Sequence, residues 1–104
     1  MKIDLCAIAR NENLTIKDWV DYHLSKGINH IYIFDNNDLL DSSLDELLGT
    51  NNKVTIIRIY KGKRSVQLET YNYFINNYQN KDWDYVGFID IDEYLVVADQ
   101  YEDI

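Results

Sequence analysis

The sequence has no proline and a single cysteine among its 104 residues. Without proline, no stretch is typical of a stiff linker, and the length fits one domain spanning residues 1–104. One cysteine excludes an internal disulfide, and Cys6 lies in the apolar run Leu5-Cys6-Ala7-Ile8-Ala9. We interpret it as a buried structural thiol. A reducing compartment agrees with this use of cysteine, so we expect a cytoplasmic protein.

Long apolar runs and basic side chains are also scarce. No run approaches the ~18 to 20 residues of a membrane span, and Met1-Lys2-Ile3-Asp4 lacks the pattern of a signal peptide. Ten Lys and Arg against eighteen Asp and Glu leave a net charge of -8. This balance argues against nucleic acid as a partner and against direct docking on an anionic membrane, so any membrane contact would be peripheral, through other proteins. It does not exclude a nucleotide, because a divalent cation can bridge carboxylates to phosphates.

What the sequence does contain is a folding composition, 46% hydrophobic and 13% aromatic, in which short apolar runs alternate with helical periodicity. Thr15 is the expected N-cap of the first helix and Gly27 its C-terminal cap. His23 shares the apolar face of this helix with Trp19 and is interpreted as a core histidine. The predicted strands are residues 3–9, 30–34, 54–60 and 85–89, with a further strand beginning at 94–97, and the predicted helices are 16–26, 42–48 and 65–79, the last partly sandwiched.

This alternation predicts an α/β fold: a mostly parallel sheet of about four strands with three helices. Polar clusters follow the predicted strands at the points where the strands end. In parallel sheets ligands bind beyond the carboxyl ends of the strands, so these clusters should converge on one edge. They are Arg10-Asn11-Glu12, Asp35-Asn36-Asn37, the basic loop 61–64, and Asp90 to Glu93.

Asp90-Ile91-Asp92 has the clearest chemical meaning. In an extended chain, residues two apart point to the same side, so both carboxylates would project together while Ile91 faces inward. Two neighbouring oxygen donors suit Mg²⁺ or Mn²⁺, which take phosphate oxygens as further ligands. The other interpretation is a solvated acidic turn after a strand, and the spacing alone does not separate the two.

An ordered set of motifs extends over nearly the whole chain, roughly residues 3 to 97. The motifs are CAIARNE at residues 6–12, Trp19 with Tyr22-His23 and Gly27, HIYIFDN at 30–36, Gln67 with Tyr71-Asn72, Trp83, and FIDIDEY at 88–94. With its motifs in this order, the chain resembles the N-terminal half of a family-2-like glycosyltransferase. The resemblance implies a GT-A fold, in which this stretch is the Rossmann-like nucleotide-binding half, a UDP- or GDP-sugar donor, and Mn²⁺ or Mg²⁺ as cofactor.

The resemblance also assigns roles by position. Asp90 and Asp92 would hold the metal and the donor diphosphate. Asp35 would lie near the base or ribose, or would instead be a turn-forming residue before two asparagines. The remaining donor-facing positions are Arg10, Asn11, Glu12, Gln67 and Asn72. For Glu12 the alternative is an exposed residue just before a helix start, and for Gln67 and Asn72 it is a solvated position on the helix surface.

The function implied is transfer of a sugar, with inversion, to a glycan or lipid-linked acceptor, as in polysaccharide biosynthesis. The catalytic base and the acceptor pocket are expected in an acceptor half that these residues do not include. A non-catalytic metal–nucleotide-binding module is the alternative. A haloacid-dehalogenase-type phosphatase also has DxD after a strand, with the first Asp as nucleophile. In that family the motif lies near the start of the domain, with Thr or Val two residues after the second Asp, whereas here it lies near the end and Tyr94 holds that position. An exposed sheet edge would favour a homodimer.

Overall fold

The computed structural model describes residues 2–10, 12–36, 44, 48–49, 51–58, 67–78 and 82–96. Its four strands pair in parallel in the order β3-β2-β1-β4, which confirms the α/β class and the parallel sheet. Two helices are described instead of three, because most of the second predicted helix lies outside the described residues. The elements are β1 (Ile3–Ala9), α1 (Ile16–Ser25), β2 (His30–Asp35), β3 (Val54–Arg58), α3 (Gln67–Tyr78) and β4 (Tyr85–Phe88).

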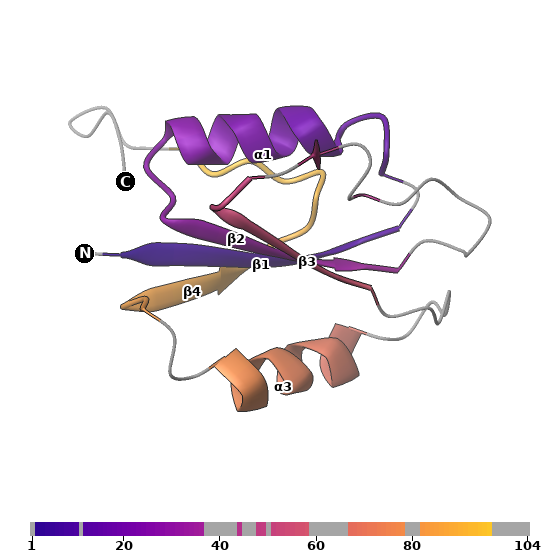
Figure 1. Cartoon of the computed structure of the whole chain (residues 1–104), viewed down its shortest axis with the longest axis vertical. Coiled ribbons are helices and arrows are strands. Elements are labelled where there is room, and N and C mark those ends of the chain that lie inside the picture. Colours follow the sequence, from indigo (N-terminus) through magenta and orange to yellow (C-terminus); the bar gives the residue numbers. More distant parts are fainter. Residues whose placement is uncertain are drawn as a thin grey trace.

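The elements form three layers, with α1 on one face of the sheet and α3 on the other (Figure 1). Alternate residues of the central strand β1 enter the two cores. Leu5 and Ala7 pack in the cluster that contains Trp19 of α1, and Cys6 packs in the cluster that contains Phe74 of α3. A strand covered on both faces needs apolar residues at successive positions, which is why this run is nearly continuous. Cys6 is a buried free thiol, as predicted.

The sequence predicts a capping residue at each end of α1, and only the C-terminal cap makes the expected hydrogen bonds. Thr15 occupies the N-cap position, but its side chain makes no capping hydrogen bond. At the other end Gly27 has a φ of 98°. The N–H of Gly27 donates to the carbonyl of Leu24, and the N–H of Ile28 donates to the carbonyl of His23, both at 3.2 Å. This pair of bonds is a Schellman motif, which requires the left-handed conformation that glycine adopts at little cost.

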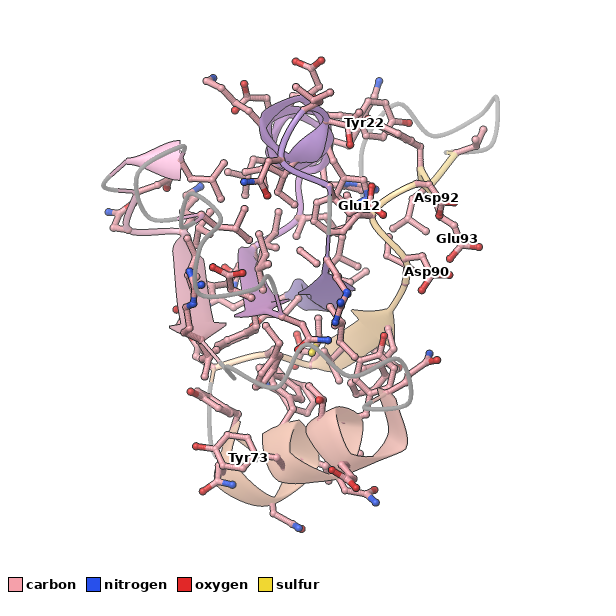
Figure 2. The ribbon with its side chains drawn as sticks, turned by 90° about the vertical axis from the view of Figure 1, so that its right-hand side faces the viewer. Glu12, Tyr22, Tyr73, Asp90, Asp92 and Glu93 are labelled. Carbon is pink, nitrogen blue, oxygen red and sulfur yellow. The ribbon has the colours of Figure 1, made fainter. Side chains whose placement is uncertain are left out.

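Two predictions about local structure are wrong. Residues 94–96 do not form a strand, because this segment runs beside α1 and bonds to its side chains instead of to the sheet. The helix α3 is not sandwiched within the described part of the chain, since Tyr73 and Ile75 are 49% and 48% exposed. Figure 2 shows Tyr73 on the outer side of α3. The basic loop 61–64 and the acidic residues beyond 96 lie outside the described residues.

No helix among the described residues combines the length and apolar character needed to cross a bilayer. Both helices are instead short and amphipathic. Their apolar faces are used within the two cores, with Trp19 and Phe74 fully buried.

Replacing Gly27 by alanine should lower the free energy of unfolding by about 1–2 kcal/mol, because the added Cβ is strained in the left-handed conformation. Chemical denaturation followed by circular dichroism measures this loss. Lys26→Ala is the matched control, since Lys26 precedes Gly27 and has a φ of -89°. Equal stabilities of the two variants would contradict the role given to Gly27.

Candidate functional site

The carboxyl ends of β1, β2 and β4 meet at one edge of the sheet because the strands are parallel. This is the edge that faces the viewer in Figure 2, where Glu12, Asp90, Asp92 and Glu93 gather on one side of the molecule. Glu12 follows β1, and the other three follow β4. The predicted convergence of polar residues on this edge is therefore present for the first and the last of the four clusters.

Asp90 to Glu93 form a tight turn, called here the acidic turn. The N–H of Glu93 donates to the carbonyl of Asp90 at 3.0 Å, and the N–H of Asp90 donates to Oε1 of Glu93 at 2.9 Å. Ile91 is 2% exposed and belongs to the core, whereas Asp90 and Asp92 are exposed. The predicted orientation of the three side chains is correct, but a turn produces it and not an extended strand. Glu93 has a structural use that the sequence did not reveal.

The side chain of Glu12 lies close enough to the acidic turn for the charges there to change its pKa. Burial raises the pKa of the Glu12 carboxyl, and the nearby charges of Asp92 and Asp90 raise it further. Three like charges at one edge are unfavourable by themselves, and a bound cation would relieve that repulsion. The sequence had offered Glu12 as a donor-binding residue or as an exposed residue before a helix, and the structure places it beside the predicted metal ligands.

The donor set fits a hard divalent cation held through few protein ligands. Asp90 and Asp92 offer carboxylate oxygens at the surface, and Mg²⁺ commonly takes one or two carboxylates together with water and phosphate oxygens. Within the described ranges, no three His, Cys, Asp or Glu side chains are arranged to hold a metal on their own. A cation here would therefore need oxygens from a ligand such as a diphosphate.

Helix α1 holds the acidic turn in place through three side chains, Trp19, Tyr22 and His23, called here the anchor residues. The indole N–H of Trp19 donates to the carbonyl of Glu93 at 2.8 Å. The hydroxyl of Tyr22 donates to the carbonyl of Leu95, and the N–H of Leu95 donates to Nε2 of His23 at 3.2 Å. All three bonds reach main-chain atoms, so they fix the backbone after Asp92 and leave the carboxylates outside.

The hydrogen bonds of His23 determine its protonation. Its Nδ1 lies 2.9 Å from the carbonyl oxygen of Trp19, while Nε2 accepts from Leu95. Since a carbonyl only accepts and an amide N–H only donates, the ring must be neutral with its proton on Nδ1. Burial lowers the pKa of His23 below its usual 6.5. The prediction of a satisfied core histidine is confirmed, and its contact with the segment after the acidic turn is new.

The structure turns Asp35 away from the acidic turn. Its carboxylate is fully buried, accepts the N–H of Leu44 at 3.3 Å and pairs with Nη1 of Arg58 at 3.2 Å. This ion pair joins adjacent positions of β2 and β3. The turn-forming role and a contact with the nucleotide both stay predictions, because the residues that directly follow Asn36 lie outside the described part of the chain. No sequence signal linked Asp35 to Arg58 before the register was known.

The other predicted donor residues are placed as follows. Arg10 directly follows β1 and is half-buried at the same edge, and Asn11 lies outside the described residues. Gln67 begins α3, whose amino end lies at the carboxyl edge (Figure 1), and it is exposed. Asn72 is exposed on α3. Their contact with a donor stays a prediction.

The fold and its edge are those of a parallel α/β domain with an anchored pair of aspartates. The chain is similar to two curated proteins named as members of glycosyltransferase family 92. It is 29% identical over 94 residues to one from Oryza sativa subsp. japonica and 30% identical over 94 residues to one from Ricinus communis. Each match covers 88% of this chain but only 15% and 16% of the relatives' own length. No family model and no solved structure matches the chain.

These two likenesses support a glycosyltransferase relationship for this stretch of chain. The ordered motifs and these likenesses agree on a glycosyltransferase relationship. The narrower assignment to the family-2-like group stays a prediction, since the relatives carry the name of family 92.

The neutral His23 makes stability depend on pH. Because its pKa is lowered in the folded state, the unfolded chain binds a proton first as the pH falls below about 6.5, and the free energy of unfolding falls with it. His23→Gln keeps an acceptor for Leu95 without a titrating group, so its stability should fall less between pH 7 and pH 5.5. Urea denaturation at each pH measures the difference between the two proteins.

The two pH profiles have to be compared with each other, because other groups also change stability with pH. Burial raises the pKa values of Asp4 and Glu12, so their titration has the opposite effect on stability from that of His23. Both remain in the variant, and so do Tyr22 and Tyr94, whose rings contact His23. Parallel pH profiles for the two proteins would show that His23 does not supply the pH dependence.

Proposed function

We propose that this chain binds the nucleotide-sugar donor of a glycosyltransferase that transfers the sugar to a glycan or lipid-linked acceptor. The observation that carries the proposal is the anchored pair Asp90 and Asp92 at the carboxyl edge of a parallel sheet, with Glu12 beside it. The likeness to glycosyltransferase family 92 proteins supports the same class of reaction.

In this proposal Asp90 and Asp92 hold a divalent cation, Mn²⁺ or Mg²⁺, against the donor diphosphate. Such a cation, when bound, neutralises the charge that develops on the departing nucleoside diphosphate. Arg10 follows the central strand at this edge and would face the nucleotide, and the resemblance assigns the same role to Asn11. The anchor residues are positioning residues, since they touch only the backbone around the acidic turn.

Transfer with inversion also needs a base that takes the proton of the acceptor hydroxyl. We assign the role of this base to none of the residues named here, and we propose that another part of the enzyme supplies it. This chain would supply donor binding and charge neutralisation. Binding of the donor without transfer is the outcome expected if the chain acts as a non-catalytic module.

Titration calorimetry with UDP and with GDP, each with and without Mn²⁺, tests donor binding directly. We expect binding of at least one nucleotide only when Mn²⁺ is present. Asp92→Ala should abolish it with the fold retained, because the carboxylate is exposed and Ile91 secures the turn. Circular dichroism of the variant checks the fold.

Asp18→Ala is the matched control, since Asp18 is also an exposed acid, on α1, and its loss changes the net charge equally. This variant should bind as the unmodified chain does. Failure of both nucleotides to bind at millimolar concentration, or an equal loss in the two variants, would overturn the proposed donor site.

We also propose that β4, which ends the described sheet, pairs with a second strand outside it. Its four residues, Tyr85–Phe88, bond to β1 along one side only in the described sheet. A second copy of the chain is one such partner, so the mass in solution should rise with concentration in sedimentation equilibrium. A monomeric mass from micromolar to millimolar chain would exclude the homodimer.

A further inference from the structure

A polar pocket, separate from the candidate site, lies at the end of the sheet opposite the acidic turn. It has a volume of about 470 Å³ and is lined from the amino ends of β1, β2 and β3, the end of α3 and the approach to β4. In Figure 1 the strands begin beyond the end of α3, so the helix does not extend over this part of the sheet. The volume is within the range of small-molecule sites.

The floor of this pocket is polar where a covered sheet is normally apolar. Asp4, His30 and Thr55 come from three adjacent strands. Each stands two residues before a side chain that packs in the core under α3, so all three are on that face. Nε2 of His30 lies 2.7 Å from Oγ1 of Thr55. Breaking the apolar pattern at three neighbouring positions costs stability, and such breaks are expected at functional sites.

Asp4 is the most unusual of these residues. Asp4 is 1% exposed, and its carboxylate accepts the side-chain N–H of Asn29 at 2.9 Å. Burial raises the pKa of this carboxyl, and the charge of Asp82 nearby acts in the same direction. A buried carboxylate is costly unless a positive charge compensates it. Lys2 at this rim binds Asp82, and the neighbouring His30 acts to lower the pKa of Asp4, against the effect of burial.

The wall of the pocket is aromatic. The rings of Tyr32 and Tyr78 lie 5.1 Å apart at 57°, and the ring of His30 lies 4.7 Å from that of Tyr32. Asp82 stands at the exposed rim. The pocket therefore combines two carboxylates with tyrosine rings.

We propose that this pocket binds a small organic cation through a primary ammonium group. Ionised carboxylates only accept hydrogen bonds, so the ligand has to bring donors, and an ammonium brings three. Its charge would offset the burial of Asp4, and the electron-rich faces of tyrosine rings attract cations. This inference does not depend on the proposed glycosyltransferase function, because the two sites lie at opposite ends of the strands.

The test is a titration of the ¹⁵N-labelled chain with 1,4-diaminobutane, followed by NMR at pH 7. We expect saturable shifts of the amides around Asp4, His30 and Thr55. The matched probe is 1,4-butanediol, which has the same length and hydroxyls in place of ammonium groups. Equal binding of the diol would overturn the assignment of a cation.

Asp4→Asn keeps the size of the side chain and removes its charge. It should weaken diamine binding by about tenfold or more, since the strongest charge-assisted bond is lost. Asp18→Asn changes the net charge equally on the outer surface of α1 and should bind as the unmodified chain does. Equal weakening by both would mean general attraction to an acidic chain and would overturn the proposal, as would unchanged binding by Asp4→Asn.

If Asp4→Asn does not fold, Tyr78→Leu replaces it as the decisive variant. Tyr78 ends α3 and lines the pocket, so its ring can be removed without placing a new polar group in the core. We expect diamine binding several-fold weaker than in the unmodified chain, in keeping with the loss of a cation–π contact. Unchanged affinity would overturn the proposal.

Discussion

Parallel pairing of β1 with β2 on one side and with β4 on the other is the constraint on which the rest of the structure depends. It buries β1 on both faces, so its residues are apolar at almost every position except Asp4. It also places the carboxyl ends of these three strands at one edge of the sheet. Glu12 and the acidic turn, which are about eighty residues apart in the chain, meet there for this reason.

In the acidic turn, the groups that hold the backbone in place are different from the carboxylates proposed to bind a cation. Its backbone is held by its own turn bonds and by the anchor residues of α1, which are neutral and buried or half-buried. Ile91 fixes the turn to the core, while the carboxylates of Asp90 and Asp92 take no part in these contacts. Like charges can therefore lie close together here without unfolding the chain. The pKa of Glu12 is raised first by burial and then by the nearby charges of Asp92 and Asp90. This division is what a cation-dependent donor site requires.

Polar residues at the two ends of the sheet serve different purposes. At the carboxyl edge the buried carboxylate of Asp35 has an internal partner, Arg58, and joins β2 to β3. At the amino end the buried carboxylate of Asp4 accepts from the neutral Asn29 amide. The first arrangement compensates a charge within the fold, whereas in the second the proposed ligand would supply the compensating charge. A sheet of four strands thereby offers a candidate site at each end.

The sequence by itself determined the order of strands and helices, the parallel sheet and the outward direction of Asp90 and Asp92, because apolar periodicity and turn residues are local signals. It also placed His23 in the core. It could not show that residues 94–96 bind α1 instead of forming a strand, or that Asp35 pairs with Arg58. These contacts join residues far apart in the chain, and only the register of the strands and the packing of α1 bring their atoms within bonding distance.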